Sequence, residues 1–92
     1  MMNNRPIVQI RIEQLIERYQ EPLYWHVRRM VVGHEDAEDV LQETFIKIFQ
    51  HLSDLQKNES ERAWVYRIAT NEALQWLRSK HEMVYIDDEE SE

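Results

Sequence analysis

Apolar residues recur at helical spacing along most of this chain, and very few residues interrupt that pattern. The chain of 92 residues contains one glycine, two prolines and no cysteine. No Asn-Gly or Asp-Gly pair marks a β-hairpin, and no sustained alternation of apolar and polar residues marks a strand. We therefore predict an all-α domain, a small bundle of about four helices.

The first two predicted helices are separated by a proline and followed by the glycine. We expect the first helix over residues 9–20 and the second to begin near Pro22, because proline is tolerated in the first turn of a helix. The second helix is expected to end at Gly33 in a left-handed cap.

Two further helices are expected after the glycine. Asp36 is a suitable N-cap for the third, which we expect to continue to about Leu52. A polar interruption follows, after which Asn58 or Ser60 can cap a fourth helix over residues 61–80.

The chain divides into three segments by composition. Residues 1–8 are expected to be an N-terminal extension, residues 9–81 the helical domain, and residues 82–92 an acidic linker or tail. Five of the last six residues are acidic, and the net charge of the whole chain is −7. The absence of cysteine and of any long apolar run predicts a soluble, cytoplasmic protein with no membrane span.

The third predicted helix has two distinct faces at about 100° per residue. Its core face is expected to hold Ala37, Leu41, Phe45, Ile48 and Leu52. The opposite face holds Asp39, Gln42, Glu43, Ile46 and Gln50. An isoleucine in the middle of a polar strip favours a protein contact, although single exposed isoleucines also occur on solvated surfaces.

The acids that open this helix do not form a recognisable metal or catalytic site. Calcium loops place their ligands around a central glycine, whereas these acids lie along a predicted helix. Neither Glu38 nor Glu43 is followed three residues later by the histidine of a di-iron helix. The chain also lacks a cysteine nucleophile and a glycine-rich phosphate loop. We predict a binding domain that is not an enzyme and needs no cofactor.

The fourth predicted helix also has two faces. Its core side is expected to hold Val65, Tyr66, Ala69, Ala73, Trp76 and Leu77, and the side chains expected to project are Trp64, Arg67, Ile68, Asn71, Gln75 and Arg78. The projecting set combines an aromatic ring, amides and guanidinium groups, which suit nucleic-acid bases and phosphates. The alternative is that Trp64 and Ile68 pack beneath the preceding loop while the arginines are solvated.

Two sequence blocks carry a resemblance to a known family. The blocks are DAEDVLQETFIKIF at residues 36–49 and RAWVYRIATNEALQWLR at residues 62–78, with LYWHVRRMVVG before them. In order and spacing they resemble region 2 of bacterial sigma-70 family factors, specifically the extracytoplasmic-function group, over roughly residues 10–80. The resemblance implies a transcription initiation factor domain that binds core RNA polymerase and recognises and melts the promoter −10 element.

The resemblance assigns the first block to polymerase binding. In that family the helix with this block docks on the clamp helices of the largest polymerase subunit. Carried over by position, the contact strip is Asp39, Gln42, Glu43 and Ile46, with Gln50 on the same face.

The second block and the loop before it, residues 53–60, are similar to the element that captures an unstacked base of the non-template strand. The DNA contacts implied on this sequence are Lys57, Asn58, Arg62, Trp64, Arg67, Asn71, Gln75 and Arg78. Base capture is physically reasonable, because unpairing exposes a ring face and hydrogen-bonding edges that a duplex hides.

The chain departs from the family in three respects. It has Glu61 where members commonly have Phe, and Gln75 where they commonly have Asp. The family's −35-reading helix-turn-helix is not among these residues, and IDDEESE at the end looks like the linker leading to it, so we favour a fragment over a naturally shortened factor. An anti-sigma factor is a further partner that the family allows. The alternative function is a helical protein-interaction module without DNA binding.

Overall fold

The elements of the protein, in chain order, are α1 (Ile7–Arg28), α2 (His34–Gln50), the 3-10 turn η1 (Leu52–Asp54) and α3 (Glu61–Ser91). The computed structural model describes the backbone of residues 7–91 and the side chains of residues 7 and 9–80. No strand occurs within residues 7–91, so the all-α class is confirmed for that part of the chain. The number of α-helices there is three instead of the expected four or so.

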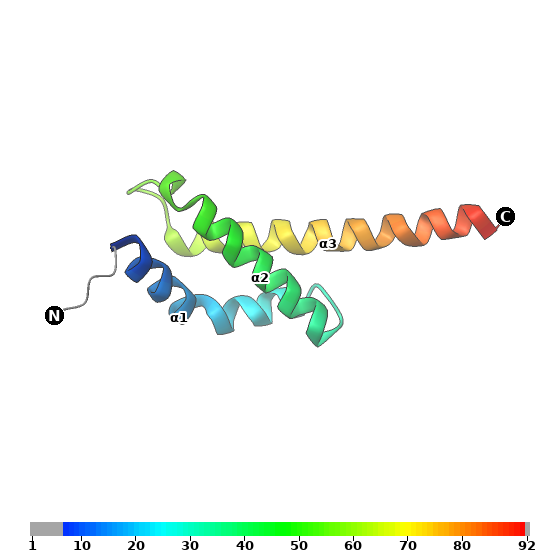
Figure 1. Cartoon of the computed structure of the whole chain (residues 1–92), viewed down its shortest axis with the longest axis horizontal. Helices are drawn as coiled ribbons and strands as arrows, with labels where there is room; N and C mark the ends of the chain where they lie inside the picture. The colour runs from blue at the N-terminus through cyan, green and yellow to red at the C-terminus, as the bar shows by residue number, and fades with distance from the viewer. Residues whose placement is uncertain (1–6, 92) are drawn as a thin grey trace.

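One helix occupies the region where two were predicted. α1 continues through Pro22, so a break at this proline is wrong. Proline lacks the N–H that would bond to the carbonyl of Arg18, and Figure 1 shows α1 changing direction along its length. Leu15, Tyr19 and Leu23 are all buried on one face of α1. Packing of that face on both sides of the proline accounts for the unbroken helix.

Gly33 starts a helix instead of ending one. Its φ of −90° and ψ of 149° are extended, so the expected left-handed cap is wrong. Gly33 is the N-cap of α2, and its carbonyl accepts a hydrogen bond from the Ala37 N–H at 3.0 Å. The expected cap at Asp36 is also wrong, because α2 begins at His34 and Asp36 lies in its first turn. A carboxylate there still interacts favourably with the helix dipole.

The start of α3 agrees with one of the two caps expected. The Ala63 N–H donates to Ser60 Oγ at 3.1 Å, which confirms Ser60 and not Asn58 as the cap. α3 then continues to Ser91, beyond residue 80 where we expected its end. Figure 1 shows the orange and red part of α3 extending past the other two helices. The use of residues 82–92 as a linker stays a prediction.

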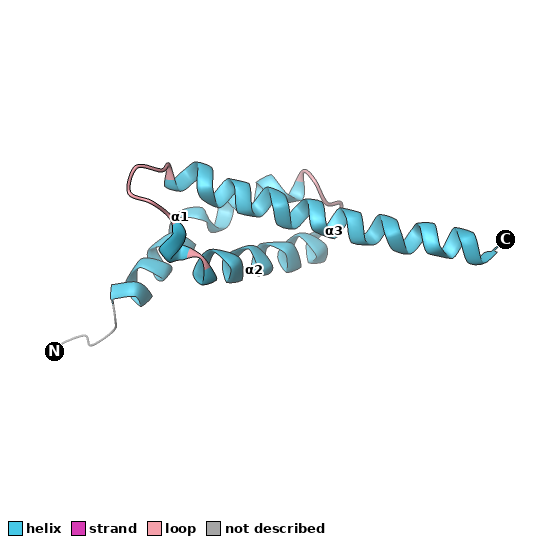
Figure 2. Cartoon of the chain, turned by 90° about the horizontal axis from the view of Figure 1, so that it is seen from above, coloured by secondary structure: helices cyan, strands magenta, loops and turns pink. Residues whose placement is uncertain are grey.

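The three helices pack against one another, as Figure 2 shows from above, and the hydrophobic core lies between them. The buried apolar side chains are Leu15, Tyr19, Leu23, Val27, Val31, Ala37, Val40, Phe45, Ile48, Trp64, Val65, Ala69 and Ala73. On α2 Ala37, Phe45 and Ile48 are buried as predicted, whereas Leu41 is only half-buried and Val40 and Thr44 are buried instead. Leu52, also predicted on this core face, lies beyond the end of α2 in η1 and is half-buried. On α3 Val65, Ala69 and Ala73 are buried as predicted, while Tyr66 is only half-buried. The core position assigned to Leu77 is wrong, since this side chain is 36% exposed.

The expected domain limits concern both ends of the chain. Residues 1–6 of the expected N-terminal extension lie outside the described residues, while residues 7 and 8 already belong to α1. None of the helices in the described part of the chain combines the length and apolar character that a membrane span requires.

Candidate functional site

The polar side of α2 is open to solvent along its whole length. Asp39, Gln42, Glu43, Ile46 and Gln50, called here the α2 strip, are all exposed, as the helical spacing predicted. Ile46 is 38% exposed in the middle of them. The strip therefore presents carboxylates and amides around one apolar side chain, a composition suited to a protein partner with basic groups. Its use as a binding site stays a prediction.

A groove of about 510 Å³ runs beside the α2 strip, between α2 and α1. Ile16 of α1 and Leu41, Phe45 and Phe49 of α2 supply apolar lining, and Ile46 borders it from the α2 strip. The strip is therefore continuous with an apolar surface, so a partner seated on α2 would contact both carboxylates and hydrocarbon.

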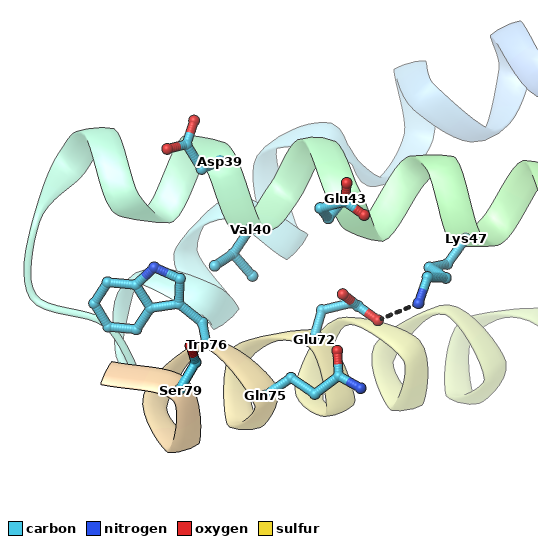
Figure 3. A pocket seen from close by; sticks show the side chains of 8 residues that line it. All are labelled: Asp39, Val40, Glu43, Lys47, Glu72, Gln75, Trp76 and Ser79. Atoms are coloured by element: carbon cyan, nitrogen blue, oxygen red, sulfur yellow. Dashed lines mark hydrogen bonds and ion pairs between the residues drawn. The ribbon is translucent and has the colours of Figure 1, made fainter. Parts of the chain in front are cut away.

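On its other side the α2 strip borders a smaller groove of about 330 Å³, between α2 and α3 (Figure 3). Across this groove Lys47 Nζ lies 3.3 Å from Glu72 Oε2. Figure 3 shows the indole of Trp76 projecting from α3 toward α2. Trp76 was expected in the core but is half-buried and lines the groove. Glu43 and Gln75, from the two different predicted sites, line the same groove.

The outer face of α3 carries the polar groups expected to contact DNA. Arg67, Asn71, Gln75 and Arg78, called here the α3 face, are all exposed. The loop residues Lys57 and Asn58 are exposed as well. The structure thus leaves two amides and two guanidinium groups available along one side of one helix, but it does not test what they bind.

The expected position of Trp64 is wrong. Its side chain is 6% exposed and belongs to the core, where Leu52, Leu55 and Ile68 pack against the same cluster. This agrees with the alternative in which Trp64 and Ile68 pack beneath the preceding loop while the arginines are solvated, since Leu55 of that loop packs on the same cluster and the arginines of this helix are exposed. An indole covered in this way has no free ring face on which a base could stack. We therefore remove Trp64 from the candidate DNA contacts.

The edge between α1 and α3 contains a cluster that the sequence alone did not indicate. His26 Nε2 lies 2.7 Å from Thr70 Oγ1, and the His26 ring meets Tyr66 edge-on at 5.0 Å between centroids. The Arg62 guanidinium stacks over the Tyr66 ring at 4.7 Å. Burial is the main cause that lowers the pKa of His26, and the positive charge of Arg29 lowers it further. The sequence did not indicate this cluster, because its residues lie far apart in the chain and none of them is unusual in its own helix.

Glu61, one of the family departures, connects the start of α3 to α1. Its Oε1 accepts hydrogen bonds from Arg18 Nη1 at 2.7 Å and from the Tyr19 hydroxyl at 3.0 Å. Its Oε2 lies 3.6 Å from Arg11 Nη2. Glu61 therefore has a structural role at the base of α3, and it fixes the helix that carries the α3 face.

Metal coordination receives no support from the described side chains. Among them no three histidine, cysteine or carboxylate groups converge as a metal site would require. The acids of α2 are spread along the helix instead of meeting at one point.

The described residues form a three-helix domain with two chemically different exposed surfaces, an acidic strip on α2 and a face of amides and guanidinium groups on α3. Residues 15–82 match the family described as Sigma-70 region 2, and the chain belongs to that family.

Curated relatives of the chain include several sigma factors of the extracytoplasmic-function group. The chain is 32% identical over 75 residues to the ECF RNA polymerase sigma factor SigW of Bacillus subtilis, covering 82% of this chain and 40% of the relative. It is 32% identical over 68 residues to SigE of Mycolicibacterium smegmatis, covering 74% of this chain and 26% of that factor. The chain therefore spans well under half the length of these relatives.

A solved structure with the same fold contains a nucleic-acid ligand. It is the NMR structure of an engineered region 2 of sigmaE in complex with GTAAAA. The two chains are 30% identical with a TM-score of 0.71, and the match covers 89% of this chain and 97% of the other.

Proposed function

We propose that this chain is the part of an extracytoplasmic-function sigma factor that binds core RNA polymerase and recognises and melts the promoter −10 element. The observation that carries this proposal is the likeness to the engineered region 2 of sigmaE, which was solved in complex with GTAAAA. That likeness extends over nearly the whole of the solved chain and is supported by membership of the Sigma-70 region 2 family. The two exposed faces described above provide one surface for each partner.

The α2 strip is the proposed polymerase surface. Asp39 and Glu43 are one helical turn apart and exposed, so both carboxylates can pair with basic groups of the clamp helices of the largest subunit. Ile46 and the apolar groove beside it add a surface that is favourable to bury on docking. Charge gives orientation and the apolar part contributes affinity.

The α3 face and the preceding loop are the proposed DNA surface. The amides of Asn71 and Gln75 each carry a donor and an acceptor for a base edge, while Arg67 and Arg78 can pair with phosphates or stack on an exposed base. Lys57 and Asn58 extend this surface into the loop. With Trp64 buried, stacking on this face falls to the guanidinium groups.

The remaining parts of the proposal follow from the family. Because the chain spans 40% or less of these relatives, we propose that a −35-reading domain and an anti-sigma contact belong to the complete factor. Both proposed partners act in the bacterial cytoplasm. RNA synthesis itself belongs to the polymerase, so this chain positions DNA and has no catalytic step of its own.

The proposal is tested by binding of the chain to core RNA polymerase. Reversing both charges, Asp39→Lys with Glu43→Lys, is expected to abolish binding while helicity is retained. The matched control is Glu17→Lys with Glu21→Lys, which makes the same charge change at the same spacing on exposed positions of α1. Equal affinity of parent and α2 variant, or equal losses in variant and control, would contradict the assignment of the α2 strip.

A further inference from the structure

We propose that the edge between α1 and α3 binds the sugar-phosphate backbone of the same DNA strand whose bases contact the α3 face. The inference rests on the proposed function and adds a second DNA surface to it. The surface, called here the basic edge, consists of His26, Arg29, Arg62 and Tyr66. Only Arg62 was indicated by the sequence.

The basic edge is one continuous row of side chains from two helices. Arg62 stacks on Tyr66 at 4.7 Å, and Tyr66 meets His26 at 5.0 Å. His26 is held by Thr70 of α3 at 2.7 Å, and the positive charge of Arg29 acts on its ring. The row therefore runs from Arg62 on α3 through the Tyr66 ring to His26 on α1, and Arg29 follows His26 three residues later in the chain. Such alternation of cations and aromatic rings is common where proteins follow a single strand.

Within the part of the chain that the structure describes, the guanidinium groups of Arg29 and Arg62 have no acceptor, unlike those of the arginines in α1. Arg11 and Arg18 both pair with Glu61, and the Arg28 guanidinium donates to the Val31 carbonyl at 3.4 Å. Among the described residues neither Arg29 nor Arg62 has a carboxylate partner, and both are exposed. On a chain of net charge −7, unpaired guanidinium groups mark the positions where an anion is least repelled.

The position of the basic edge favours DNA over an acidic protein. Arg62 lies in the first turn of α3, directly after the loop of Lys57 and Asn58, so the edge adjoins the loop part of the proposed DNA surface. A strand that lies along α3 carries one phosphate per nucleotide, and the phosphates that leave that face need cations nearby. Backbone contacts of this kind position a strand without reading its sequence.

The experiment measures binding of the 92-residue chain to single-stranded oligonucleotides of about 12 nucleotides, a length within the range of known single-strand binding sites. One oligonucleotide contains GTAAAA and the other is a scramble of it. Each phosphate contact with a single strand contributes about 0.7 to the slope of log K against log salt. We expect Arg29→Gln to lower that slope by about 0.7 and to weaken both oligonucleotides equally, and Arg62→Gln to do the same. Arg29→Lys, which keeps the charge, is expected to retain the slope.

The matched control is Arg28→Gln, which removes the same charge from the adjacent residue but one whose guanidinium is directed at the Val31 carbonyl. If the parent binds and Arg29→Gln keeps its affinity and slope, the basic edge is wrong while the proposed function stands. Equal losses in Arg29→Gln and Arg28→Gln would reduce the effect to net charge and also overturn the inference. If the parent binds neither oligonucleotide, the proposed DNA function itself fails.

Discussion

Arg18 Nη1 lies 2.7 Å from Glu61 Oε1, and this ion pair joins the middle of α1 to the first residue of α3. The bond to Glu61 raises the pKa of Arg18, and burial, followed by the bond to Glu61, raises the pKa of Tyr19. Members of the resembled family commonly have an apolar ring where this chain has Glu61. In this chain the Glu61 carboxylate is held instead by three side chains of α1, those of Arg11, Arg18 and Tyr19.

The contribution of this contact to stability can be measured. We expect Glu61→Ala to lower the free energy of unfolding by about 1 kcal/mol, because the Tyr19 hydroxyl, on a side chain only 5% exposed, loses its acceptor. Glu61→Gln keeps an acceptor and should cost less. Urea unfolding followed by circular dichroism gives both values. In a Tyr19→Phe background the cost of Glu61→Ala should shrink, and an unchanged cost would contradict this coupling.

The burial of Trp64 predicts a loss of stability, and not of DNA contact, when it is replaced. Trp64→Ala should lower the free energy of unfolding by about 3–5 kcal/mol, as expected for removal of a large buried ring. The measurement is the urea midpoint, with the exposed Arg67→Ala as a control that should stay near the parent value. A Trp64→Ala variant as stable as the parent would mean that the ring is not part of the core.

The α3 face predicts different consequences for its amides and its arginines. Asn71→Ala should weaken the GTAAAA oligonucleotide more than its scramble, because an amide can distinguish base edges. Arg67→Gln and Arg78→Gln should weaken both and reduce the salt slope. Fluorescence anisotropy titrations at several salt concentrations separate the two effects. If Asn71→Ala weakened both oligonucleotides equally, the amide would have no part in base recognition.

The lowered pKa of His26 predicts a stability that depends on pH. The folded protein holds the His26 proton more weakly than the unfolded chain, so protonation favours unfolding. This contribution is present at neutral pH and is lost as the pH falls below about 6.5, the ordinary histidine value, toward the lower folded pKa. Urea midpoints at pH 7.5 and 5.5 should therefore differ more for the parent than for His26→Gln. Identical differences would show that other groups account for the change.

The helical periodicity predicted most inward and outward positions correctly. The α2 strip is exposed, and Ala37, Phe45 and Ile48 are buried, because residues three and four apart share a side of a helix whatever that helix packs against. The helix boundaries were predicted less well. Pro22 and Gly33 are strong breakers in isolation, but a proline within a well-packed helix is tolerated and a glycine in extended conformation can precede a helix.

The candidate sites, like the helices, could be predicted only in part from the sequence. The sequence blocks were sufficient to suggest the family and to place the polar strip on α2 and the amide-bearing face on α3. They could not show that Trp64 is buried, because its burial depends on residues outside α3. Leu52 and Leu55 pack against the core cluster that contains Trp64. Nor could they bring together Lys47 with Glu72 or His26 with Thr70, which lie 25 and 44 residues apart.

The sequence by itself determined the all-α class, the inward face of most of each helix and the composition of the exposed strips, because these depend on spacing within ten or so residues. The tertiary structure decided that α1 is continuous, that Trp64 is in the core and that a basic edge exists between α1 and α3. Each of these depends on which helix lies against which, and the periodicity of a single helix contains no information about its neighbour.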